Sequence, residues 1–286
     1  MRATTRNSSV ARVSLAALIL LAGARLLLGA GGAAPTDVRT KEMPFKYEGK
    51  VVPGLVGWNN HVKGKRPGVI VIHSLWGYND HVREQVKRLA DSGYVGYAFD
   101  MGGSGSVATH VDHDKEMTKQ NAGHPAQRVA RFTAAIEQLK QDPHVDPNRI
   151  SAIGYCWGGA VVLDMARAGV KLDSVVSFHG TLSTQTPAQK GQVTSRVLVL
   201  TGELDPYAAS KAVETFRKEM TEAGARFEIV TYPGVMHAFT EPYAKEEILD
   251  LGGTPARGVD RGIKYNADAD NQSWAAMLKL FKEIYR

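Results

Sequence analysis

The sequence predicts a single α/β domain in which a mostly parallel, twisted β-sheet carries helices on both faces. Short uninterrupted apolar runs, such as residues 69–72, are typical of strands buried on both faces of a sheet. These runs alternate with longer segments whose apolar residues have helical spacing, and such alternation predicts a parallel sheet. The chain has 286 residues and contains neither an internal repeat nor a proline-rich linker. Its length and organisation therefore favour one domain, which we place at residues 45–286.

The expected elements follow one another along this domain. After a polar lead-in at residues 35–42, two short strands are expected within residues 45–61, around Pro53-Gly54. Pro125 suits the first turn of a helix and Gly93 suits the end of one. Further strands are expected at residues 69–72, 95–99, 150–155, 175–178, 197–201 and 227–232. Helices are expected at residues 81–92, 125–139, 158–168, about 208–223 and 272–285.

Residues 1–34 have the composition of a secretory signal peptide. Three arginines precede a charge-free run at residues 13–24, and small residues follow at 29–34. A membrane-spanning helix needs about 20 apolar residues, so this run is short for an anchor. We therefore expect export to the periplasm or the medium, with an ambiguous cleavage site. The alternative is an uncleaved signal that anchors the protein in the membrane.

The charge of the chain argues against nucleic acid as a partner. The formal net charge is +6, but the first 34 residues hold four arginines and no acidic residue, which leaves about +2 for the rest. No run of lysine and arginine occurs later in the chain. We expect a small-molecule partner, no nucleic acid, and no stable membrane association after the signal is cleaved.

The single cysteine, Cys156, lies in a sequence typical of a nucleophile. The motif GYCWGG at residues 154–159 follows an expected strand and opens an expected helix. Such a sharp turn needs small residues two positions before and after the nucleophile, and both are glycine here. The helix N-terminus also favours a thiolate. The alternatives are a buried structural cysteine and a redox-active thiol that acts with a partner, although the chain has no Cys-x-x-Cys spacing.

A thiol nucleophile needs a base, and the base needs an orienting carboxylate. In hydrolases of this architecture the chain order is nucleophile, acid, histidine. Asp205 and His237 each follow an expected strand, so both should lie at the same edge of the sheet as Cys156. Glu203 competes with Asp205 for the role of the acid. His179, which also ends an expected strand, competes with His237 for the role of the base.

The loop after the strand at 69–72 is expected to complete the site. The backbone N–H of Trp157 should face a developing oxyanion, and the N–H of Leu75 is the candidate for a second donor. An ordinary βα turn is the alternative interpretation of that loop. Core packing is the alternative for the aromatic residues Trp76, Tyr78, Trp157 and Phe239. Candidate pocket residues are Ser74, Trp76, Tyr78, His179, Phe239 and Glu241.

Two further segments carry no chemistry in this interpretation. Residues 110–114 (HVDHD) contain side chains of the metal-binding type, but no second cluster completes a coordination shell. Residues 102–105 (GGSG) lack the lysine of a phosphate-binding loop. We therefore expect neither a metal nor a cofactor.

The segments at residues 73–79 and 154–159, the Asp205 loop and the motif HAF at 237–239 together resemble the dienelactone hydrolase family. The match covers most of residues 45–286, and its most specific part is the cysteine in the sharp turn at residues 154–159, which we call the elbow. The resemblance implies an α/β-hydrolase fold without a cofactor. It also implies a triad of Cys156, Asp205 and His237 that opens an ester or lactone through a thioacyl-enzyme, with an oxyanion hole formed by two backbone N–H groups.

Two residues depart from the family pattern. Ser74 stands where the family usually has a glutamate that helps to activate the thiol. Glu241 stands where characterised members have an arginine that binds the substrate carboxylate, and its charge would repel an anionic lactone. An ester or lactone hydrolase remains the prediction. The alternative that Ser74 raises is a hydrolase-fold binding protein whose catalysis is weakened.

Overall fold

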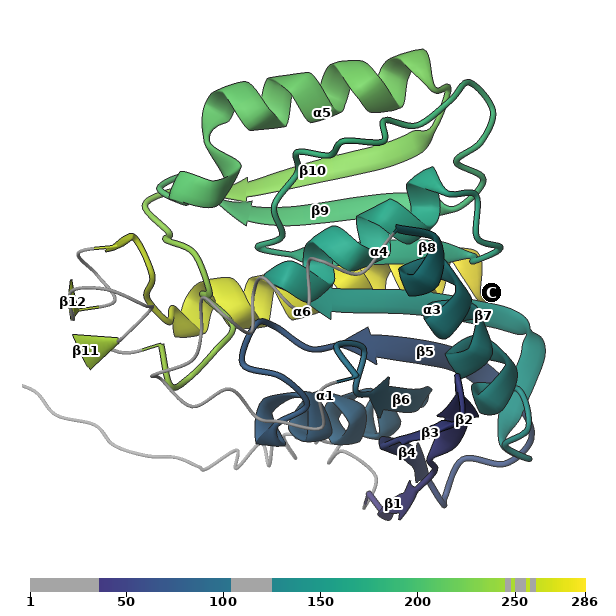
Figure 1. Cartoon of the computed structure of the whole chain (residues 1–286). Coiled ribbons are helices and arrows are strands. Elements are labelled where there is room, and N and C mark those ends of the chain that lie inside the picture. The colour runs from purple at the N-terminus through teal and green to yellow at the C-terminus, as the bar shows by residue number, and fades with distance from the viewer. Residues whose placement is uncertain (1–35, 104–124, 245–247, 250–255, 258–260) are drawn as a thin grey trace, which may run out of the picture. The chain divides into compact units, whose positions relative to one another are not determined.

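An eight-stranded β-sheet organises the part of the chain that the structure describes (Figure 1). The structure is a computed structural model that describes residues 36–103, 125–244, 248–249, 256–257 and 261–286. In spatial order the strands of the sheet are β1 (Val38–Glu42), β4 (Gly54–Asn59), β6 (Val95–Phe99), β5 (Arg66–Ile72), β7 (Val145–Tyr155), β8 (Ser174–Phe178), β9 (Arg196–Gly202) and β10 (Arg226–Tyr232). Two small hairpins pair β2 (Phe45–Tyr47) with β3 (Lys50–Val52) and β11 (Ile248–Leu249) with β12 (Ala256–Arg257).

The sheet is mostly parallel, as the sequence predicts. From β6 to β10 every neighbouring pair of strands runs parallel, and only β4 runs against both of its neighbours, β1 and β6. The carboxyl ends of parallel strands meet at one edge of a sheet. The loops after β5, β7, β9 and β10 therefore come together, and these are the loops that carry the candidate catalytic residues.

Helices cover both faces of this sheet. α3, α4 and α5 share an apolar cluster with residues such as Ile70 and Ile72 of β5. α1 and α6 pack on the other face, against residues such as Val69 and Val71. This alternation follows from the period of two along a strand. The helices are α1 (Asp80–Asp91), α3 (Pro125–Leu139), α4 (Trp157–Arg167), α5 (Ser210–Glu222) and α6 (Ala267–Ile284), with a 3-10 turn η1 (Pro206–Ala208) before α5.

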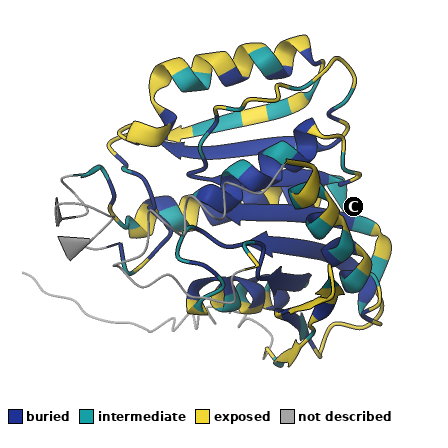
Figure 2. Ribbon diagram, viewed as in Figure 1, coloured by how far each residue is buried: buried dark blue, intermediate teal, exposed yellow. Residues whose placement is uncertain are grey.

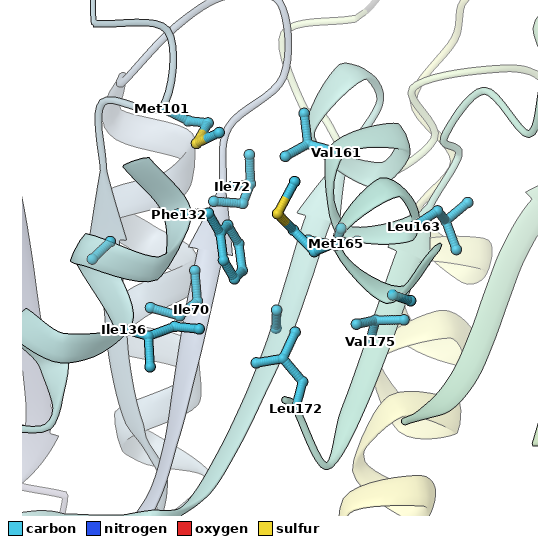
Figure 3. Packing of buried hydrophobic residues seen from close by; sticks show 14 of the residues in the cluster. Ile70, Ile72, Met101, Phe132, Ile136, Val161, Leu163, Met165, Leu172 and Val175 are labelled. Carbon is cyan, nitrogen blue, oxygen red and sulfur yellow. The ribbon is translucent and has the colours of Figure 1, made fainter. Parts of the chain in front are cut away.

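The core between α3, α4 and the sheet is continuous and apolar. Figure 3 shows Phe132 of α3 and Met165 of α4 side by side, with Phe132 between Ile72 and Ile70 of β5. The central strands are buried on both faces, whereas α5 exposes most of its outer side (Figure 2). Burying a large aliphatic or aromatic side chain contributes about 1.5–3 kcal/mol, so this core holds the elbow between β7 and α4 in place.

β1 corrects the expectation that residues 35–42 form a polar lead-in. Its sequence, VRTKE, has no apolar period, and its side chains are mostly exposed. Backbone pairing with β4, from Val38 opposite Asn59 to Glu42 opposite Leu55, places it in the sheet. A strand at the edge of a sheet needs no buried face of its own, so hydrophobic patterning does not reveal it. The compact unit accordingly runs from Thr36 to Arg286.

The first residues of two elements, β7 and α6, lie five residues before the expected ones, each for a local reason. β7 begins at Val145 instead of residue 150, because residues 147–149 form an irregularity opposite the step from Pro67 to Gly68. α6 begins at Ala267, before the expected residue 272, because the side chain of Asn266 caps it by accepting a hydrogen bond from the Ala269 N–H at 2.9 Å.

Several predictions concern residues outside the described ranges. The signal peptide at residues 1–34 and the histidine-containing segment at 110–114 lie there, so both stay predictions. Among the helices that the structure describes, none combines the length and the apolar character needed to cross a membrane.

Candidate active site

Cys156 occupies the sharp turn between β7 and α4. Its φ of 52° and ψ of −114° lie in a region that non-glycine residues rarely adopt, which costs about 1–3 kcal/mol that the surrounding packing must offset. A Cβ atom at Gly154 would clash with the backbone of Gly158, and one at Gly158 would clash with the backbone of Ile72. Both glycines of the motif are thus required by close backbone approach, which is the arrangement expected from the sequence.

His237 lies between the thiol and a carboxylate. Its Nε2 is 3.0 Å from the Cys156 Sγ, and its Nδ1 is 2.8 Å from Oδ2 of Asp205. The His237 backbone is fixed as well, because its N–H donates to the carbonyl of Gly262 at 2.8 Å and its carbonyl accepts from the Lys264 N–H at 3.0 Å. The structure therefore brings together the three residues that the sequence singled out.

The two acidic candidates have different partners. Asp205 is buried, and besides contacting His237 it accepts a hydrogen bond from the Tyr207 N–H through Oδ1 at 2.8 Å. The Glu203 carboxylate is exposed and accepts from the Gly234 N–H at 2.8 Å. Asp205 is the residue that orients the imidazole, because it is the one in contact with Nδ1.

The surroundings of His237 favour its charged form. Burial alone lowers the pKa of His237, but the nearby Cys156 sulfur and the carboxylate of Asp205 outweigh that effect and raise the pKa to about 10. A histidine with a raised pKa retains a proton that it accepts from a neighbouring thiol. The geometry and the charges thus suit proton transfer between sulfur and imidazole.

A cavity of about 690 Å³ opens beside this group of residues. Its volume lies in the range of small-molecule sites. Leu75 and Trp157, the residues whose N–H groups are the candidate oxyanion donors, line it together with Cys156 and His237. Because β5 and β7 are neighbours, the loop that follows β5 and the start of α4 approach each other at this point. The remaining walls include Trp76, Tyr207, Glu241, Arg261, Ile263 and polar residues between Thr181 and Thr186.

Four of the six candidate pocket residues lie outside the cavity wall, namely Ser74, Tyr78, His179 and Phe239. Phe239 is fully buried in the core, where its ring contacts those of Tyr232 and His179. Tyr78 packs against the α1 side of the core beneath the guanidinium of Arg83. The sequence could not separate pocket from core, because aromatic residues serve both. Trp76 and Glu241 do line the cavity, as expected.

His179 supports the elbow from behind instead of lining the cavity. Its Nδ1 accepts a hydrogen bond from the Cys156 N–H at 3.1 Å, and its Nε2 lies 2.8 Å from Oγ1 of Thr240. Burial, and then the proximity of His237, hold the pKa of His179 well below its usual value. A neutral ring with an unprotonated Nδ1 is the form that can accept this bond. His179 therefore holds the backbone of Cys156, whereas His237 contacts its sulfur.

Ser74 is linked to Glu241 through Tyr243. The Ser74 Oγ is 3.5 Å from the Tyr243 hydroxyl, which donates to Oε2 of Glu241 at 2.5 Å. Burial, followed by the charge of Glu241, raises the pKa of Tyr243. Ser74 itself is buried and lies outside the cavity wall. The two positions at which this chain departs from the family pattern thus belong to one hydrogen-bonded group.

Several residues of the site escaped the sequence analysis. Tyr207 places its ring 4.7 Å from that of His237 and lines the cavity. Its position directly after Asp205-Pro206 was the signal available. The polar segment from Thr181 to Thr186 follows β8 at the same sheet edge, but it carries no motif. Within the described ranges, no cluster of three or more His, Cys, Asp or Glu residues could hold a metal ion.

Comparisons with known proteins identify the family to which the chain is similar. The model of the dienelactone hydrolase family matches residues 52–285. A protein of Escherichia coli O157:H7, described as a candidate carboxymethylenebutenolidase, is 27% identical over 229 residues, which cover 77% of this chain and 78% of that protein.

Solved structures extend the similarity to the fold. A dienelactone hydrolase-like promiscuous phosphotriesterase from metagenomic libraries is 30% identical with a TM-score of 0.74, and the match covers 86% of this chain and 98% of that one. An α/β-hydrolase enzyme from a deep-sea metagenome library is 16% identical with a TM-score of 0.61, covering 87% and 99%. The predicted α/β-hydrolase fold is thereby confirmed.

Proposed function

The chain belongs to the dienelactone hydrolase family, a family of carboxylic ester hydrolases, and from this premise we propose that it opens an ester or lactone through a thioacyl-enzyme on Cys156. The observation that carries the proposal is the chain of short contacts from Asp205 through His237 to the Cys156 sulfur. Asp205 orients the ring, His237 moves the proton, and the sulfur attacks the carbonyl carbon.

The first half-reaction transfers the acyl group to sulfur. His237 takes the thiol proton at Nε2, and the sulfur lone pair forms a bond to the carbonyl carbon while the carbonyl π pair moves onto oxygen. Backbone N–H groups of Leu75 and Trp157 stabilise this oxyanion. When the tetrahedral intermediate collapses, the C–O bond to the alcohol breaks, and the departing oxygen takes the proton from His237.

The second half-reaction returns the thiol. Water attacks the thioester carbon, and His237 accepts a proton from that water at Nε2. Collapse of the second intermediate breaks the C–S bond and releases the carboxylic acid, and the sulfur regains its proton from His237. Ser74 has no carboxylate to assist these steps, so activation rests on His237 and on the N-terminus of α4.

Replacing the nucleophile tests this proposal directly. We expect Cys156→Ala to reduce kcat/KM for a nitrophenyl ester by about a thousandfold or more while the protein stays folded. Mass spectrometry of the wild-type protein, quenched during turnover, should show the added mass of one acyl group. After digestion, that added mass should lie on the peptide that contains Cys156. Undiminished hydrolysis by Cys156→Ala would refute the nucleophile.

The same measurements address the two alternatives, which the comparisons do not favour. A hydrolase-fold binding protein with weakened catalysis would bind esters with little turnover, and Ser74→Glu would raise its activity. A redox-active thiol protein would form a mixed disulfide at Cys156 and no acyl-enzyme.

We also propose that the protein is exported, with residues 1–34 acting as the signal. The arginines before the apolar run at 13–24 and the small residues after it support this proposal. Expression in a Gram-negative host, followed by fractionation and mass analysis of the N-terminus, tests it. A shortened chain in the periplasm is expected, a full-length chain in the membrane fraction would indicate the anchored alternative, and a full-length cytoplasmic chain would contradict both.

A further inference from the structure

Glu241 is one of the residues that line the catalytic cavity, and one of its carboxylate oxygens has no hydrogen-bond partner among the described residues. The residue is fully buried, with 0% of its surface exposed. Its Oε2 accepts the hydroxyl of Tyr243 at 2.5 Å, whereas Oε1 has no hydrogen-bond partner among the residues that the structure describes. Buried polar atoms are nearly always hydrogen-bonded, so an exception beside a ligand cavity requires an explanation.

The carboxylate is held in one orientation. The Glu241 N–H donates to the carbonyl of Ala238 at 3.0 Å, and the Glu241 carbonyl accepts from the Ala244 N–H at 2.8 Å. The Tyr243 ring, which anchors Oε2, packs edge-on against Trp76 with ring centroids 6.0 Å apart. Because one oxygen and the backbone are fixed, the direction of Oε1 is fixed as well.

The cavity wall contains two acidic residues, Glu241 and Asp164, and among the described residues only the charge of Asp164 is balanced by arginines. Asp164 is 3.4 Å from Arg128 and 3.2 Å from Arg167, so its charge is balanced within the protein. Of the residues that the structure describes, no lysine or arginine pairs with Glu241 in this way. A buried carboxylate that is neither paired nor fully hydrogen-bonded is unfavourable, and a donor supplied by a ligand would relieve it.

We propose that Glu241 determines substrate specificity by accepting a hydrogen bond from a hydroxyl or ammonium group of the substrate at Oε1. The enzyme then selects esters or lactones that carry such a donor on the acyl chain, and it discriminates against substrates that carry a carboxylate there. This inference rests on the proposed function, since it concerns the substrate of the same cavity. It assigns the carboxylate a role in binding and none in the chemical step.

A matched series of esters tests the inference. Nitrophenyl hexanoate is compared with its terminal hydroxy, ammonio and carboxy derivatives, so that chain length and leaving group stay constant. For the unmodified protein we expect kcat/KM to be at least about tenfold higher for the ammonio ester than for the carboxy ester, because hydrogen bonds to charged groups are strong. A higher kcat/KM for the carboxy ester would overturn the inference without any variant being needed.

Two variants identify the residue responsible. Glu241→Gln should reduce the ratio of kcat/KM between the ammonio and the carboxy ester by about tenfold. Tyr243→Phe removes the hydrogen bond that Oε2 of Glu241 accepts but keeps the carboxylate. This variant should therefore retain a preference for the ammonio ester. An unchanged ratio in Glu241→Gln would refute the role of Glu241. A ratio is used because it cancels any change in overall activity.

A binding measurement separates this inference from the proposed function. If the unmodified protein hydrolyses none of the esters, the proposed function fails, and the Kd values of the corresponding non-hydrolysable amides are measured by calorimetry. Tighter binding of the ammonio amide than of the carboxy amide, with the difference lost in Glu241→Gln, would still support the inference. Equal Kd values would overturn it.

Discussion

The carboxylate of Asp205 uses both of its oxygens, one for the imidazole of His237 and one for the N–H of Tyr207. In Asp205→Asn, the side-chain amide can present an N–H to Nδ1, which would favour the tautomer that leaves Nε2 protonated and unable to accept a proton. We expect kcat to fall by about a thousandfold or more while the protein stays folded, as measured with a nitrophenyl ester and circular dichroism. Glu203→Gln, at a carboxylate that bonds Gly234 instead, is the control. Equal effects of the two substitutions would contradict the assignment.

His179 links the stability of the elbow to pH. Burial, with a smaller effect of His237, lowers the pKa of His179 well below its usual 6.5. Below pH 6.5 the unfolded chain binds a proton that the folded chain does not, so the free energy of unfolding decreases as the pH falls. His179→Asn should reduce this acid destabilisation, because asparagine tolerates the φ of 42° and cannot be protonated in this range. Urea unfolding of the wild-type protein and of His179→Asn, each at pH 7 and pH 5, measures this effect. If the free energy of unfolding fell equally in both proteins between pH 7 and pH 5, the prediction would be contradicted.

At the scale of elements, the sequence was most informative where a strand is buried on both faces. The continuous apolar run at 69–72 and the glycines around Cys156 made the parallel sheet and the elbow predictable. β1 was not predictable, because its pairing with β4 depends on the backbone, which is the same for every residue. The contact of His179 with the Cys156 N–H was equally hidden, since no local pattern encodes a hydrogen bond between two neighbouring strand ends.

The cavity wall between Thr181 and Thr186 depends on a buried ion pair between α4 and α5. Arg167 bonds both oxygens of Glu219, at 2.9 and 3.0 Å, and its Nη2 also donates to the carbonyl of Leu182 at 2.7 Å. Glu219→Gln removes the negative partner of a buried guanidinium. We expect a loss of about 2–3 kcal/mol in the free energy of unfolding, less than for a fully isolated charge because Asp164 remains nearby. KM should rise more than kcat falls, since the wall loosens while the triad stays in place.

Glu222→Gln on the same helix provides the matched comparison. Glu222 pairs with Lys218 on the exposed side of α5, where an ion pair contributes at most about 0.5 kcal/mol. Denaturant unfolding and steady-state kinetics of both variants check the prediction. If the two substitutions lowered stability equally and left KM unchanged, the ion pair would have no part in shaping the cavity.

At the scale of the whole molecule, one sheet connects the C-terminal helix to the catalytic edge, by which we mean the sheet edge that carries Cys156, Asp205 and His237. α6 buries Phe281 in the same cluster as Tyr155, the residue that directly precedes Cys156. Because the two faces of the sheet share their strands, removing the Phe281 ring should weaken the entire unit and not α6 alone. We expect Phe281→Ala to lower the free energy of unfolding by about 3–5 kcal/mol, whereas Lys282→Ala, at the exposed neighbouring position, changes it little. Tryptophan fluorescence and residual esterase activity, followed in the same urea titration, should shift together in Phe281→Ala. A loss of fluorescence that left activity intact would mean that α6 and the catalytic edge unfold independently, and the sheet could then no longer be regarded as one cooperative support for the site.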